Sequence, residues 1–172
     1  TVSNTIADIL EANGRKVLSN RAGSNMWSGI ATTLLAGFTL SGKLRKSYDA
    51  AVLEVDERSS PRIYPYVQPD VLVVTNLYRD SIKRNGHSEF IFGKIAQALP
   101  AGTRLLLNGD DMISGLLGEG SNERVFFRVA RTSRSTDTCV NTACDRSACP
   151  AAGICWPLTI SITTTPAGLP AR

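Results

Sequence analysis

The sequence predicts an α/β fold with a mainly parallel sheet flanked by helices. Two short apolar runs rich in β-branched residues, Ala50–Val55 and Val71–Val74, have the length of strands and end abruptly in polar residues. Such runs are typical of strands that are buried on both faces, as in parallel sheets covered by helices. Helical and strand patterns also alternate along the chain, and this alternation favours βα units.

Each expected element follows from the spacing of its apolar residues. Helical spacing is found in four segments: 1–13, 26–38, 88–99 and the short 112–117. Strand-like runs are found in five: 16–19, 50–55, 71–75, 103–107 and 124–129. Between them lie a basic linker, Lys43–Ser47, and a proline-interrupted segment, Pro61–Val67. We expect the Met26, Ile30 and Leu34 stripe to lie in the core.

The ends of the first and third helices are marked by particular residues. Gly14 follows the first helix as a plausible C′ residue, and no capping signal precedes that helix. A helix that starts uncapped at residue 1 suggests that the chain begins inside a longer reading frame. Ser88 is expected to cap the third helix, and Pro100 to close it.

Composition limits the class of protein. The chain has 172 residues, of which 42% are hydrophobic and 20% charged, as in one ordinary globular domain. No apolar run approaches the roughly 18 residues of a membrane span, and no signal segment opens the sequence. The net charge is +4, but the basic residues are scattered and aromatic residues are few. This excludes a nucleic-acid-binding stripe and is compatible with a small anionic substrate.

Polar residues follow both central strands. Glu54 to Glu57 end the first run, and Thr75 to Asp80 end the second. In an open parallel sheet, ligands bind beyond the carboxyl ends of the strands, so both groups are expected at that edge. Carboxylates, an amide and a guanidinium suit a magnesium–phosphate complex. Ordinary loop polarity after a strand is the alternative.

Five stretches carry a resemblance to a known family. In order they are TVSNTIADIL, VLSNRAGSNMWSGIATTLL, AVLEVDE, PDVLVVTNLYRDSIKRNGHSEF and LLLNGDD. Together they resemble the central, P-loop-NTPase-like domain of Mur ligases, and most closely the MurT-type subunits of lipid II isoglutaminyl synthase. The resemblance implies a Mur ligase-like domain over residues 1–130, followed by an irregular tail over 131–172.

The resemblance also implies metal and catalytic residues. Glu54 matches the strand-end carboxylate that holds magnesium in the family, and Glu57 is assigned to the metal with it. Asn76 and Arg79 lie in the loop that lines the acyl-phosphate region and are the expected catalytic residues. Asp80 is expected to orient that loop, and the alternative for Arg79 and Asp80 is a surface ion pair.

Four further residues are expected to bind the cofactor or substrate. Asn108 and Asp110 match positions near the adenine side of the nucleotide. Asn20 and Arg21 match a loop near substrate or phosphate. Simpler structural roles stay open: Asp110 and Asp111 can cap the following helix, and Asn20 can form a turn. The only histidine, His87, is expected to be a helix-entry or surface residue.

The tail contains all four cysteines: Cys139, Cys144, Cys149 and Cys155. MurT-type proteins are expected to carry a zinc ribbon with two C-x-x-C pairs, and this sequence contains no such pair. Cys149-Pro150 matches only the start of one pair. A frameshifted remnant of the ribbon is one explanation, and a divergent tail is the other. A cytoplasmic protein would keep these thiols reduced.

The function implied by the resemblance is that of an ATP- and Mg²⁺-dependent ligase in peptidoglycan synthesis. It would convert the D-glutamate of lipid II, or another peptidoglycan precursor, to D-isoglutamine in the cytoplasm, using ammonia from a GatD-like glutaminase partner. The family's ATP-binding loop, TGTNGKTT, would precede Thr1, so we expect this chain alone to be inactive. The alternative is a degenerate, non-catalytic nucleotide-binding or scaffold domain. An unrelated P-loop kinase-like domain is disfavoured because AVLEVDE and TNLYRD occur together.

Overall fold

The computed structural model describes residues 1–21, 24–41, 43, 45–77, 88–111, 113–128 and 163–165. The predicted site residue Arg79, its neighbour Asp80, His87 and the four cysteines lie outside the described residues. The chain divides into two compact units, Thr1–Ile63 and Tyr64–Arg172, and each is described by itself. The prediction of one domain over 1–130 stays a prediction.

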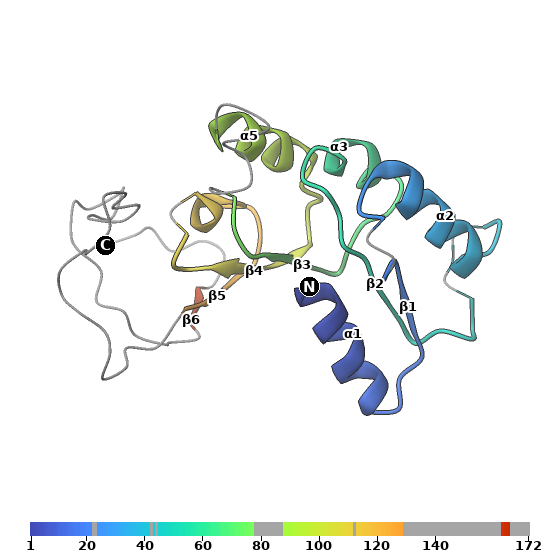
Figure 1. Ribbon diagram of the computed structural model, residues 1–172. Coiled ribbons are helices and arrows are strands. Elements are labelled where there is room, and N and C mark those ends of the chain that lie inside the picture. Colours follow the sequence, from blue (N-terminus) through green and yellow to red (C-terminus); the bar gives the residue numbers. More distant parts are fainter. Residues whose placement is uncertain are drawn as a thin grey trace, which may run out of the picture. The chain divides into compact units, whose positions relative to one another are not determined.

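The first unit contains a two-stranded parallel sheet (Figure 1). Its elements, in chain order, are α1 (Val2–Ala12), β1 (Val17–Ser19), α2 (Trp27–Gly37), β2 (Ala50–Val52) and α3 (Ser60–Ile63). Helix α1 contacts both strands and α2 contacts β1. The buried apolar residues of this unit are Ala7, Leu18, Ile30 and Ile63.

Helix α1 has the expected end and an unexpected start. Gly14 follows the C-cap residue Asn13 at φ +77°, in the left-handed region that glycine adopts without strain. At the start, the Thr1 hydroxyl accepts a hydrogen bond from the Asn4 N–H at 3.4 Å. The helix is therefore capped, and the expectation of an uncapped start is wrong.

The predicted core stripe of α2 is only partly correct. Ile30 is fully buried and Leu34 is half-buried, but Met26 is 65% exposed. Met26 is the N-cap residue and has extended backbone angles, φ −85° and ψ 164°. Because Met26 precedes the first helical turn, its side chain does not follow the apolar repeat of α2.

Strand β2 is shorter and more exposed than its apolar run predicts. It ends at Val52, and Ala51 in its middle is exposed, so the expectation of burial on both faces is wrong here. The Asn20 side chain, not a neighbouring strand, bonds both backbone groups of Glu54. The ladder therefore stops before the end of the apolar run.

The second unit contains a four-stranded sheet in the order β3-β4-β5-β6. Its elements are β3 (Val71–Val74), α5 (Ser88–Ala98), β4 (Arg104–Asn108), the 3-10 turn η1 (Ser114–Leu116), β5 (Arg124–Phe127) and β6 (Thr163–Thr165). The first three strands are parallel, and β6 pairs antiparallel with β5. Strand β6 is a regular element within the stretch expected to be irregular. The mainly parallel α/β class is confirmed.

The core of the second unit lies between this sheet, α5 and the segment after η1. Its buried residues are Val74, Leu77, Ile91, Ile95, Leu105, Leu107 and Leu117. The short helix expected at 112–117 is a single 3-10 turn. Within the described residues, no helix has the length and apolar character that crossing a membrane requires.

Candidate functional site

In the first unit, the polar residues after β1 and β2 meet at the carboxyl end of the parallel pair. The Oδ1 atom of Asn20 accepts a hydrogen bond from the Glu54 N–H at 2.9 Å. The Nδ2 group of Asn20 donates to the Glu54 carbonyl at 2.8 Å and to the Ser24 carbonyl at 3.0 Å. Asn20 is buried, so one amide side chain fixes the backbone that presents the Glu54 carboxylate.

The carboxylate of Glu54 has its own hydroxyl partner. The Ser3 hydroxyl donates to Oε2 of Glu54 at 2.7 Å, and the Thr1 hydroxyl lies 2.7 Å from that of Ser3. These hydrogen bonds, that of Ser3 first and that of Thr1 second, lower the pKa of Glu54 below its ordinary value of 4.5. Glu54 is therefore ionised at neutral pH.

Arg21 points to helix α1. Its guanidinium contacts Asp8 at 2.5 Å and Glu11 at 2.7 Å, residues one helical turn apart. All three side chains are largely exposed, and the bond to Asp8 raises the pKa of Arg21. Anion binding by Arg21 would compete with these two carboxylates.

Glu57 lies in the turn that leads into α3. Its carbonyl accepts a hydrogen bond from the Ser60 hydroxyl at 2.7 Å. The neighbouring Asp56 accepts from the Arg58 N–H at 3.0 Å, as in an Asx turn. In the described part of the chain, no three His, Cys, Asp or Glu side chains gather to hold a metal. Glu54 still fits magnesium, which usually takes one or two protein carboxylates together with substrate phosphates.

A hollow of about 410 Å³, lined mostly by residues with polar side chains, opens beside Asn20. It is lined by Ser19, Asn20, Arg21, Ser24, Ser28, Gly29, Thr32 and Thr33, with no acidic residue among them. A Cβ atom on Gly29 would lie 2.0 Å from the Ser24 Cβ atom, so this glycine lets the loop approach α2. The buried Ser19 hydroxyl has no hydrogen-bond partner among the described residues.

The hydroxyl groups of this hollow were missed from the sequence. Ser28 and Thr32 are four residues apart in α2, as are Gly29 and Thr33, so all four lie on one helical face. The four-residue spacing in α2, next to a loop expected to bind substrate, is the sequence signal that could have identified these residues. Hydroxyl, amide and guanidinium groups suit an anionic or hydroxylated ligand, but several of these groups already have partners. The Arg21 guanidinium is paired with Asp8 and Glu11, and the Thr32 and Thr33 hydroxyls donate to carbonyls of their own helix.

In the second unit, Asn108 lies at the carboxyl end of β4 and Asn76 lies just after β3. The Asn108 Nδ2 group donates to the Thr75 carbonyl at 2.8 Å, and its Oδ1 atom accepts from the Asp110 N–H at 2.8 Å. Asp111 is buried, and it accepts from the Leu77 N–H at 2.8 Å and the Ile113 N–H at 3.2 Å. Both residues thus have structural contacts, and Asp111 was not among the predicted site residues.

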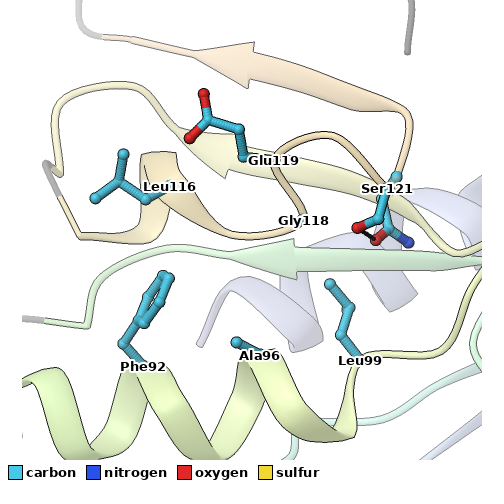
Figure 2. Close-up of a pocket in the computed structure, with 8 residues that line it drawn as sticks. Phe92, Ala96, Leu99, Leu116, Gly118, Glu119 and Ser121 are labelled. Atoms are coloured by element: carbon cyan, nitrogen blue, oxygen red, sulfur yellow. Dashed lines mark hydrogen bonds between the residues drawn. The ribbon is translucent and has the colours of Figure 1, made fainter. Parts of the chain in front are cut away.

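A second hollow, of about 240 Å³, lies between α5 and the segment that joins η1 to β5. Figure 2 shows Phe92, Ala96 and Leu99 on one side of it, facing Leu116 and the segment that holds Gly118 and Glu119. Asn122 closes this region by donating to the carbonyls of Pro100 and Thr103, before β4 begins.

No protein-family model matches the chain. Curated proteins do match it. The chain is 34% identical over 128 residues to "Lipid II isoglutaminyl synthase (glutamine-hydrolyzing) subunit MurT" of Staphylococcus aureus, and the aligned region covers 74% of this chain and 28% of that protein. It is 42% identical over 113 residues to the MurT subunit of Streptococcus pneumoniae, which covers 64% of this chain and 24% of that protein.

The parallel strands flanked by helices, with polar residues at their carboxyl ends, are consistent with the α/β fold of a Mur ligase-like domain. At 34–42% identity, the matched part of the chain belongs to the family of MurT subunits of lipid II isoglutaminyl synthase. The chain spans about a quarter of the length of these curated relatives.

Proposed function

We propose that this chain supplies nucleotide- and metal-binding residues to an ATP-dependent ligase subunit of peptidoglycan synthesis. The substrate is the D-glutamate α-carboxyl of lipid II, or of another peptidoglycan precursor, and the product is D-isoglutamine. Ammonia comes from a GatD-like glutaminase partner, in the cytoplasm. The match to MurT subunits over 113–128 residues carries this proposal.

The proposed reaction has two steps. An oxygen of the substrate carboxylate attacks the γ-phosphorus of ATP, the bond to ADP breaks, and an acyl phosphate forms. Ammonia then attacks the acyl carbon, phosphate leaves, and the nitrogen loses a proton to give the amide. ATP supplies the phosphoryl group, and Mg²⁺ neutralises charge on the phosphates.

The residues of this chain would act by holding charge in place. Glu54, with its backbone fixed by Asn20 and its carboxylate bonded by Ser3, is the proposed ligand of Mg²⁺, with Glu57 nearby in sequence. Asn76 and Arg79 are proposed to bind the acyl-phosphate oxygens. Stabilisation of this kind needs donors that are fixed before the reaction, and such fixed groups give a large part of the rate acceleration of enzymes.

The hollow beside Asn20 is the proposed seat of an anionic part of the substrate. Asn20, Ser24 and the α2 hydroxyl groups line it. Arg21 would have to leave Asp8 and Glu11 to take part. Asn108 and Asp110 are proposed to lie near the nucleotide, with Asn108 also holding Thr75.

Calorimetry with ATP and Mg²⁺ tests the nucleotide assignment. We would compare this chain with a longer version that carries the TGTNGKTT loop before Thr1. Binding by the longer version, lost on Glu54→Ala and kept on Glu119→Gln at an exposed carboxylate, is expected. Failure of the longer version to bind would contradict the assignment.

A second experiment separates a ligase from a degenerate scaffold. The full-length protein that contains this sequence would be mixed with its glutaminase, lipid II, ATP and glutamine. Conversion of D-glutamate to D-isoglutamine, detected by mass spectrometry, is the expected result. Nucleotide binding without conversion would instead support a non-catalytic Mur-like domain.

A further inference from the structure

Two side chains from the end of β4 hold the backbone that follows β3. Asn108 donates from Nδ2 to the carbonyl of Thr75, and Asp111 accepts at Oδ2 from the N–H of Leu77; both distances are 2.8 Å. These contacts join segments 33 and 34 residues apart. They lie on either side of Asn76, whose side chain is exposed at this edge.

The holding groups are themselves fixed. Asp111 is 8% exposed, and its Oδ1 atom accepts from the Ile113 N–H at 3.2 Å. The Ser114 hydroxyl, fully buried, donates to the carbonyls of Asn108 at 3.2 Å and Asp111 at 3.3 Å. Leu77 is part of the apolar core, so the held backbone is anchored by packing as well.

We infer that Asn108 and Asp111 are positioning residues that fix the backbone carrying Asn76 where it leaves β3. The two peptide groups that they hold flank Asn76, so a small displacement there would move the Asn76 side chain. A misplacement of about 1 Å in a positioned group is enough to lower a reaction rate by about a hundredfold. This inference rests on the proposed function, in which Asn76 binds the acyl phosphate.

A carboxylate suits position 111 because both of its oxygens accept backbone N–H groups. Asp111→Ala removes both acceptors, whereas Asp111→Asn removes only one, because its amide can turn so that the remaining oxygen accepts from either N–H group. Asn108→Asp is the complementary change, because it replaces the donor to Thr75 with an oxygen that faces a carbonyl. Asn108→Asp keeps the size of the side chain.

Residue-resolved hydrogen exchange on this chain tests this pair of contacts directly; we call the hydrogen bonds of Asn108 to Thr75 and of Leu77 to Asp111 the clamp. In Asp111→Ala, which removes both acceptor oxygens, exchange of the Leu77 amide should rise about tenfold or more, while the Leu105 and Leu107 amides keep their protection. Asp70→Ala, the same change at an exposed position, should leave Leu77 unaffected. In Asn108→Asp, the carbonyl carbon resonance of Thr75 should shift. Unchanged exchange at Leu77 in Asp111→Ala would overturn the inference.

Kinetics of the full-length protein with its glutaminase test the consequence for the reaction. For Asp111→Ala we expect kcat to fall about tenfold or more, with KM for ATP changed less than about threefold, because the nucleotide is still bound. A normal kcat, or a rise in KM alone, would overturn the positioning role. If the unmodified protein forms no D-isoglutamine, the proposed function fails, and exchange at Leu77 still decides whether the clamp exists.

Discussion

Asn20 bonds Glu54 through both of its backbone groups, accepting from its N–H at 2.9 Å and donating to its carbonyl at 2.8 Å. The Asn20 side chain, one residue after the end of β1, thus makes the two backbone hydrogen bonds that a neighbouring strand would otherwise make. The Glu54 carboxylate is thereby presented from a fixed backbone while the strand ladder ends. The unit therefore has a rigid acidic position at the edge of a very short sheet.

Asn20→Asp should destabilise the first unit while keeping the size of the side chain. The new oxygen would face the carbonyls of Glu54 and Ser24, which now accept hydrogen bonds from Nδ2. Loss of buried hydrogen bonds of this kind costs about 1–3 kcal/mol in the free energy of unfolding. Urea unfolding measures it, with Gln68→Glu as the exposed amide-to-acid control. Equal stability of the two variants would contradict the role of Asn20.

Ser3→Ala should raise the pKa of Glu54 toward its ordinary value, since the Ser3 hydroxyl is the first cause of its lowering. A carboxyl with a lowered folded pKa adds stability above its unfolded pKa, and that stability is lost as pH falls through the folded pKa. The variant should therefore lose stability at a pH of about 6 and little below the folded pKa. Carbon-detected NMR titration of Glu54 measures the shift. Ser47→Ala, at an exposed serine, is the control, and an unchanged pKa in Ser3→Ala would refute the assignment.

Gly118 and Gly120 form a matched pair in the turn before β5. Both have positive φ, +63° and +76°, but only at Gly118 would a Cβ atom meet neighbours, at 2.4 Å from Cδ1 of Leu105. Gly120→Ala should cost about 1 kcal/mol from backbone strain, and Gly118→Ala about 2 kcal/mol or more because overpacking adds to the strain. Urea unfolding followed by amide exchange at Leu105 measures both. A smaller cost at Gly118 would show that the turn gives way.

Two glycines in helices should respond to alanine in opposite directions. A Cβ atom on Gly93, in the middle of α5, would meet nothing within 4 Å, so Gly93→Ala should stabilise by about 0.5–1 kcal/mol. On Gly37, at the end of α2, it would lie 2.0 Å from Cδ2 of buried Leu18, and Gly37→Ala should destabilise by about 1–3 kcal/mol. Thermal unfolding of the two variants measures the difference. The same sign for both would contradict the packing described here.

Much of the fold follows from local spacing, because each helix and strand has its own apolar repeat. The α/β class and most of the elements could be predicted from that repeat, but α3 and β6 were not predicted. Met26 was wrongly expected in the core because the apolar repeat does not show where the N-cap ends and the helix begins. The ends of β2 and η1 were also wrong, since side chains from elsewhere in the chain fix them.

The candidate site was predicted less completely, for a physical reason. Asn20, Glu54, Asn76 and Asn108 are recognisable as polar residues after strands. The contacts of Ser3 with Glu54 and of Asp111 with Leu77 join residues 51 and 34 apart. Nothing in the local sequence marks such pairs, because they depend on how strands are brought together. Arg79 lies outside the described residues, so its role stays a prediction.

The hydrogen bonds around Asn108 also bear on chemical ageing. Asn108 precedes Gly109, and asparagine followed by glycine is prone to deamidation through attack of the next backbone nitrogen on the side-chain amide. Here the Gly109 N–H donates to the Phe127 carbonyl at 2.8 Å, and the Asn108 amide is held by Thr75 and Asp110. Both reacting groups are thus restrained while the strands stay paired. Deamidation at this position would accordingly record how often the sheet has opened during storage.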